Sequence, residues 1–130
     1  MFEKYMICDS GFRNVSEQGA VTGFQIQVRI AYYRGVPLSS VEDYAVVVDG
    51  ETIPRERIRF SVEGRSFPLT DLPKITDFRW QFGDIATVTA GKPGGLTPGM
   101  HELEVTQRLR VPYTDNRDIA TARKKMTLVD

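Results

Sequence analysis

The sequence predicts an all-β protein: an antiparallel β-sandwich of about eight strands, jelly-roll-like or immunoglobulin-like. Three observations predict this class. Apolar residues recur at every second position in most of the chain, turn-forming pairs such as Asp49-Gly50 separate these stretches, and no long stretch has helical spacing. A chain of 130 residues suits one domain, residues 1–130, with a core of its own.

The alternation of apolar and polar residues is clearest over residues 24–32, 58–62 and 102–111. Each of these stretches predicts a strand with one buried and one solvated face, which is typical of antiparallel sheets. Asp49-Gly50 suits the positive φ angles of a two-residue hairpin turn, and Pro54 has no N–H for a neighbouring strand and so ends the pairing that follows.

Weaker patterns predict further strands at residues 2–8, 65–69, 85–90 and 122–129. In the stretch 69–78, the residues Leu69, Leu72, Ile75 and Phe78 have helical spacing, but Pro73 interrupts it. We therefore expect a loop there with at most one helical turn.

Charge and composition exclude several classes of partner. Seventeen basic and seventeen acidic side chains cancel, so neither nucleic acid nor an anionic membrane is expected to bind. The longest apolar run, residues 44–48, is far shorter than the roughly 20 residues of a membrane span. Cys8 is the only cysteine and the N-terminus has no signal-peptide pattern, so we expect a cytoplasmic protein.

The residues that could do chemistry are few. His101, the only histidine, is in step with Leu103 and Val105, which predicts an imidazole at the rim of the sandwich, hydrogen-bonded to a loop. Cys8 has an acidic neighbour and is expected to be a small buried hydrophobe. Glu42 and Asp43 are neighbours on a strand and point to opposite faces. We expect no catalytic residue, no metal ligands and no cofactor in this chain.

The glycine-rich segment "GKPGGLTPG", residues 91–99, is the most conspicuous loop. It lacks the spacing of a phosphate-binding loop and is followed by a strand, not by a helix. It is longer than a plain hairpin needs, and long loops often carry contacts. The candidate residues for a partner interface or active-site rim are therefore Lys92, Pro93, Gly94, Gly95 and Leu96, with Leu96 as the apolar anchor.

Aromatic residues provide a second lead. Alternation leaves Tyr33 and Arg34 on the wet side at a strand end, where they are further candidates for the interface or rim. Phe78, Trp80 and Phe82 share one face and are expected to be core residues. Exposed aromatic rings also leave open a free-standing carbohydrate-binding module that stacks on sugar rings, and the scarcity of catalytic side chains makes a self-sufficient enzyme the weakest hypothesis.

Three blocks together carry a family resemblance: "GFRNV" at 11–15, "TGFQIQVRIAYYRGVPLSSVEDYAVVVDGE" at 22–51 and "RWQFGDIATVTAGKPGGLTPGMHELEV" at 79–105. The chain resembles the small β subunit of bacterial C-glycoside deglycosidases. The resemblance implies an all-β subunit that assembles with a larger α subunit, whose barrel is similar to those of sugar-phosphate isomerases and epimerases.

The resemblance also implies the chemistry of the complex. In this family the α subunit holds a divalent metal ion, typically manganese, and the acid/base residues. The pair acts as a lyase on the carbon–carbon bond between an oxidised sugar and an aromatic aglycone such as a flavonoid. The expected role of this chain is that of the non-catalytic subunit of a hetero-oligomer.

Overall fold

The computed structural model describes residues 5–30, 35–110 and 117–128. Eleven strands lie in this part of the chain: β1 (Arg13–Glu17), β2 (Ala20–Val28), β3 (Val36–Pro37), β4 (Val41–Val48), β5 (Glu51–Thr52), β6 (Ile58–Val62), β7 (Arg65–Pro68), β8 (Arg79–Trp80), β9 (Ala86–Gly91), β10 (Gly99–Arg110) and β11 (Arg117–Leu128). Eight of them have four or more residues and three have only two. The predicted number therefore equals that of the longer strands, but β1 was not predicted. Of the two-residue strands, β5 follows the predicted Asp49-Gly50 turn, whereas β3 and β8 were missed.

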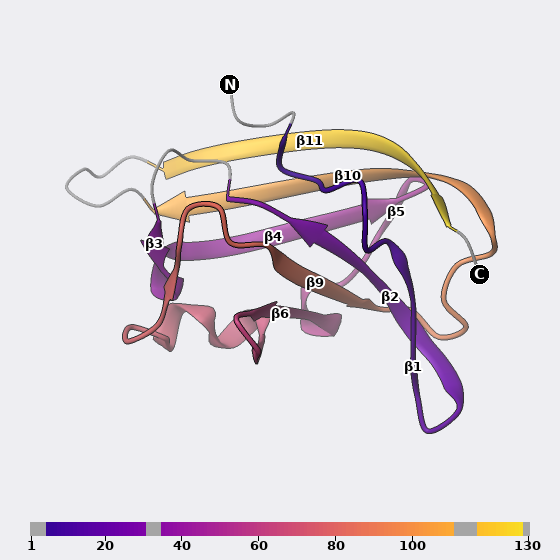
Figure 1. Cartoon of the computed structure of the whole chain (residues 1–130), viewed down its shortest axis with the longest axis horizontal. Coiled ribbons are helices and arrows are strands. Elements are labelled where there is room, and N and C mark those ends of the chain that lie inside the picture. The colour runs from indigo at the N-terminus through magenta and orange to yellow at the C-terminus, as the bar shows by residue number, and fades with distance from the viewer. Residues whose placement is uncertain (1–4, 31–34, 111–116, 129–130) are drawn as a thin grey trace.

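The strands form two main antiparallel sheets. One has the order β1-β2-β9-β6-β7 and the other the order β11-β10-β4-β5, while β3 and β8 pair separately. Figure 1 shows β4, β10 and β11 side by side as the long strands of one layer, with β9 and β6 in the other. The all-β, antiparallel sandwich predicted from the sequence is confirmed.

The alternating residues fill the space between the two sheets, as predicted. Phe24, Ile26 and Val28 on β2, like Leu103 and Val105 on β10, are at most 1% exposed and belong to one core cluster. Burying such side chains stabilises the fold by about 1.5–3 kcal/mol each. The core therefore lies between the layers, and the ends of the sandwich are built from loops.

The core contains a buried polar pair, Gln107 and Tyr44, beside a cluster of aromatic rings. The Gln107 side-chain amide donates to the Tyr44 hydroxyl, and both residues are 1% exposed. Burial raises the pKa of the Tyr44 phenol, so the hydroxyl stays neutral. Tyr44 and Trp80 both pack against Phe60, with the Trp80 ring 5.1 Å from the Phe60 ring, centroid to centroid.

The predicted hairpin turn is confirmed. Asp49 and Gly50 connect β4 to β5 with φ angles of 50° and 84°. These angles suit the type I′ turn, whose twist matches that of the flanking strands. The chain then leaves the sheet after β5, and Pro54 precedes a 3₁₀ segment at Arg55–Arg57.

Two predicted elements differ from the structure. Residues 5–8, the described part of the predicted strand 2–8, form only an isolated bridge, Ile7 to Val28, because Met6, Ile7 and Cys8 are all buried and cannot alternate across one sheet. The expected single turn near Pro73 is a six-residue 3₁₀ segment, Leu69–Lys74, since Leu69 and Leu72 both reach the core.

The last strand is longer than expected. β11 begins at Arg117, not at 122, because it pairs with β10 along its whole length, from Gly99↔Leu128 to Arg110↔Arg117. Among the described residues, no helix has the length and apolar character that crossing a membrane requires.

Candidate functional site

The glycine-rich loop joins the two sheets of the sandwich. It runs from Lys92 to Pro98, between β9 in one sheet and β10 in the other. The loop is therefore longer than a hairpin turn because its ends belong to strands that do not pair with each other. The connection between the two sheets explains the length of the loop, so this length is not evidence for a partner.

The β1–β2 hairpin holds one side of this loop. The Asn14 side-chain amide donates to the Leu96 carbonyl and its oxygen accepts from the Leu96 N–H, both at 2.9 Å. The Gly94 N–H donates to the Val21 carbonyl at 3.0 Å. Asn14 thus pairs with the loop backbone as a strand residue would, and fixes its position.

The β4–β5 hairpin holds the other side. The Lys92 ammonium lies 2.9 and 3.1 Å from the two carboxylate oxygens of Glu51. Gly94 and Gly95 have φ angles of 82° and 65°, and a Cβ atom on Gly95 would lie 2.5 Å from the Asn14 side-chain oxygen. The second glycine is thus required both by its backbone conformation and by the close approach of Asn14.

Leu96 does not have the exposed position that was expected of an apolar anchor. Its side chain is 8% exposed and belongs to the protein's own core cluster. It turns inward because the Asn14 side chain binds both the carbonyl and the N–H of Leu96. Pro93 and Gly94 are the exposed members of the predicted set, and their contact with a partner stays a prediction.

His101 lies beneath the loop, as expected for an imidazole at the rim of the core. Its Nδ1 atom is 2.6 Å from the Asp49 carboxylate, its Nε2 atom is 2.6 Å from the Thr97 carbonyl oxygen, and the residue is 7% exposed. The hydrogen bonds to Thr97 and Asp49 raise the pKa of His101, and the bond from His101 lowers the pKa of Asp49. A cavity of about 250 Å³ beside these residues is also lined by Lys92 and Glu51.

Tyr33 and Arg34 lie outside the described residues. The residues that flank them are at the other end of the sandwich from the loop, because Val28 pairs with Ala86 at one end of β9 and Gly23 pairs with Gly91 at the other. Whether Tyr33 and Arg34 form part of an interface or active-site rim stays a prediction.

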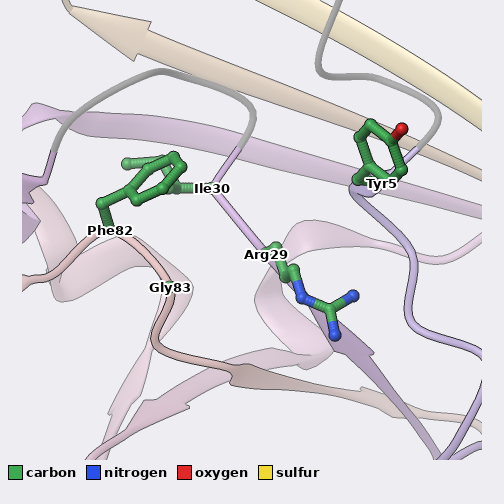
Figure 2. Close-up of a pocket in the computed structure, with 5 residues that line it drawn as sticks. All are labelled: Tyr5, Arg29, Ile30, Phe82 and Gly83. Atoms are coloured by element: carbon green, nitrogen blue, oxygen red, sulfur yellow. The ribbon is translucent and has the colours of Figure 1, made fainter.

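At the end of the sandwich near Val28, the structure has an apolar pocket that the sequence analysis missed. It has a volume of about 450 Å³ and is lined by Tyr5, Arg29, Ile30, Phe82 and Gly83. Figure 2 shows the Tyr5 and Phe82 rings on opposite sides, with the Arg29 side chain below both rings and its guanidinium pointing away from the space between them. Tyr5 is 59% exposed and Phe82 is 57% exposed, so the prediction that Phe82 is a core residue was wrong.

A turn explains the exposure of Phe82. The Asp84 N–H donates to the Gln81 carbonyl at 3.1 Å, which closes a β-turn with Phe82 and Gly83 at its centre. Gly83 has a φ angle of 93°, and the Trp80 indole N–H donates to the Asp84 carbonyl at 3.0 Å. Phe82 thus leaves the alternation of the preceding strand, and Gly83 was the only sequence signal of this change.

The other candidate groups are engaged within the fold. Cys8 is 3% exposed and burial raises the pKa of its thiol, as expected for a structural cysteine. Trp80 is fully buried and offers no face for stacking on a sugar ring. In the part of the chain that the structure describes, no three histidine, cysteine or acidic side chains gather as a metal site would require.

Comparisons with known proteins agree on one family. The family model "C-glycoside deglycosidase beta subunit" matches residues 2–113. The C-glycoside deglycosidase beta subunit of Eubacterium cellulosolvens is 34% identical over 103 residues, which cover 78% of this chain and 70% of that protein. The 3'-dehydrocarminate deglycosidase beta subunit of a Microbacterium species is 36% identical over 93 residues, covering 71% and 69%. A C-glycoside deglycosidase beta subunit of Arthrobacter globiformis is 36% identical over 94 residues, covering 70% of each chain.

Proposed function

The chain belongs to the C-glycoside deglycosidase beta subunit family, and from this premise we propose that it is the non-catalytic subunit of a carbon–carbon lyase complex. The name of the family implies a partner α subunit. In the proposal, the complex releases an aromatic aglycone from a C-glycoside whose sugar carries a ketone at C3. The complex works in the cytoplasm, where a lone thiol such as Cys8 stays reduced.

The proposed chemistry is an elimination. The ketone at C3 acidifies the C–H bond at C2, so a base removes that proton and leaves an enolate. The electron pair of the enolate then forms a C1–C2 double bond. The bond from C1 to the aglycone breaks, and the aryl carbon keeps the electron pair and takes up a proton. A divalent metal ion such as Mn²⁺, held by an α subunit with an isomerase/epimerase-like barrel, would stabilise the enolate.

The observation that carries the non-catalytic role is the engagement of His101. A general base needs a nitrogen lone pair within reach of substrate, but both nitrogens of this ring lie 2.6 Å from acceptors of the chain itself. Among the described residues, no three histidine, cysteine or acidic side chains gather, which supports assigning the metal ion and the steps of the elimination to the α subunit. The support for the reaction class comes from the names of the relatives, which are beta subunits of deglycosidases.

Co-expression tests this proposal. The chain is produced alone and together with a C-glycoside deglycosidase α subunit from the same organism, and the products are separated by size-exclusion chromatography. We expect a stable complex that converts a 3-oxo-C-glucoside, whereas the chain alone is inactive and shows no tight Mn²⁺ binding by calorimetry. Turnover by the isolated chain, or a stoichiometric Mn²⁺ site in it, would contradict the non-catalytic role.

A further inference from the structure

We propose that the pocket between Tyr5 and Phe82 is the docking surface for the α subunit, which inserts an apolar side chain there and places a carboxylate against Arg29. This inference rests on the proposed function, because it takes the partner to be the α subunit. It moves the expected interface away from the glycine-rich loop, to the opposite end of the sandwich.

Exposed apolar side chains gather at this end. Six large hydrophobic residues are exposed in the described part of the chain, and Tyr5, Phe82 and Ile85 are three of them. Ile85 directly precedes Ala86, which pairs with Val28 beside the pocket. Aromatic residues and arginine are enriched at the centres of protein interfaces, and a cluster of exposed apolar groups marks such a surface.

Hydrogen bonds order the backbone that carries these rings. Phe82 is held by the Gln81–Asp84 turn, which the buried Trp80 anchors through its indole N–H. The Arg29 N–H donates to the Met6 carbonyl at 2.8 Å, which fixes the backbone next to Tyr5 against the end of β2. A backbone that is already ordered loses little conformational entropy on binding, which favours a binding contact.

Charge indicates the chemistry of the partner surface. In the part of the chain that the structure describes, no carboxylate lies within ion-pair distance of the Arg29 guanidinium. Lys124, which binds the Asp9 carboxylate, lowers the pKa of Asp9, and the more distant Arg29 adds to this lowering. An acidic side chain of the α subunit beside the inserted apolar group would complement this cation.

The opposite end of the sandwich is a poorer docking surface. There the Lys92 ammonium is bound to Glu51, the His101 ring is bound to Asp49, and Leu96 is buried. The charges of Lys92 and His101 are therefore already matched within the chain. A second copy of this chain is also disfavoured at the pocket, because a two-fold contact would bring Arg29 against Arg29.

Association measurements test the inference. The complex is formed from the full-length chain and the α subunit, and the Kd is measured by biolayer interferometry for wild type, Phe82→Asp, Phe82→Ala and Arg29→Glu. We expect each variant to bind at least about tenfold more weakly. Arg29→Lys keeps the charge and should retain most of the affinity. All variants should keep the melting temperature of the wild type, because both side chains are exposed.

Matched controls lie elsewhere on the surface. Met100 is 68% exposed at the loop end, and Lys125 is exposed on β11. Met100→Asp and Lys125→Glu make the same changes of polarity and charge, and should change the Kd by less than about twofold.

The outcomes separate the inference from the proposed function. If the wild-type chain does not bind the α subunit, the proposed function fails and the inference fails with it. If the wild type binds but Phe82→Asp and Arg29→Glu bind equally well, only the inference is overturned. If these variants assemble normally but Phe82→Ala loses binding of a flavone probe, the pocket is a small-molecule site and docking is again overturned.

Discussion

The Nδ1 atom of His101 lies 2.6 Å from the Asp49 carboxylate, and this contact ties the start of β10 to the β4–β5 turn. The other ring nitrogen lies 2.6 Å from the Thr97 carbonyl. A carbonyl oxygen and a carboxylate only accept, so both nitrogens donate only when the ring carries two protons. The geometry therefore corresponds to an imidazolium that fastens the glycine-rich loop to the sandwich.

The stability of the fold should depend on this charge. The pKa of His101 is raised in the folded chain, so its contribution is fully present below the unfolded value of about 6.5 and is lost as the pH rises through the folded pKa. The pKa of Asp49 is lowered, so its contribution is present above about 4 and is lost as the pH falls. We expect the free energy of unfolding, measured in urea, to be larger at pH 5.5 than at pH 8.5.

His101→Gln provides the control for the pH dependence. This variant keeps one donor for a hydrogen bond but carries no charge, so the difference between the two pH values should shrink strongly. Removing a hydrogen bond to a charged group lowers the free energy of unfolding by about 1.5–3 kcal/mol. For His101→Gln this decrease should be largest at the acidic pH, where the wild-type ring is charged. An equal pH dependence in wild type and variant would show that another group is responsible.

Trp80 and Phe82 are two residues apart and should behave oppositely. Trp80 is fully buried against Phe60, so Trp80→Ala should lower the free energy of unfolding by about 3–5 kcal/mol. Phe82 is 57% exposed, so Phe82→Ala should change it by no more than about 0.5 kcal/mol. Urea titrations of both variants check this, and a large loss for Phe82→Ala would mean that the ring supports the fold.

The strands with strict alternation could be predicted from the sequence because their burial depends on local spacing alone. Phe24, Ile26 and Val28 share a face in any sheet that has one dry side, and so do His101 and Leu103. The sheet to which each strand belongs is a long-range property. β9 and β10 lie in different sheets, which explains the length of the loop between them. The spacing of apolar residues in these strands does not indicate this separation.

The pocket could not be predicted for the same reason. It brings together residues 5, 29, 30, 82 and 83, which only the paired strands place side by side. Phe82 was assigned to the core because the alternation was extended through a turn that begins at Gln81. Leu96 was predicted to be the apolar anchor for a partner, but it turns inward, and this position depends on Asn14, 82 residues away along the chain.

Gly94 and Gly95 form a matched pair for testing how tightly the loop is held. Both have positive φ angles, and alanine in that conformation costs about 1–2 kcal/mol. A Cβ atom on Gly94 meets nothing within 4 Å, whereas one on Gly95 would lie 2.5 Å from Asn14 and 2.6 Å from Val21. Gly95→Ala should therefore lower the free energy of unfolding clearly more than Gly94→Ala. Equal losses in thermal or urea unfolding would mean that Asn14 moves away without cost.

Shortening the loop should damage the fold. Replacing residues 92–97 by Asn-Gly makes a turn that suits paired neighbouring strands, but β9 and β10 lie in different sheets. The change also removes Leu96 from the core, the partner of Asn14, and the Thr97 carbonyl that binds His101. Leu96→Ala alone should lower the free energy of unfolding by about 2–5 kcal/mol, and the shortened chain should lose more, while Pro93→Ala at the exposed apex should change it little. A shortened chain with the urea midpoint of the wild type would show that the loop does not hold the two sheets together.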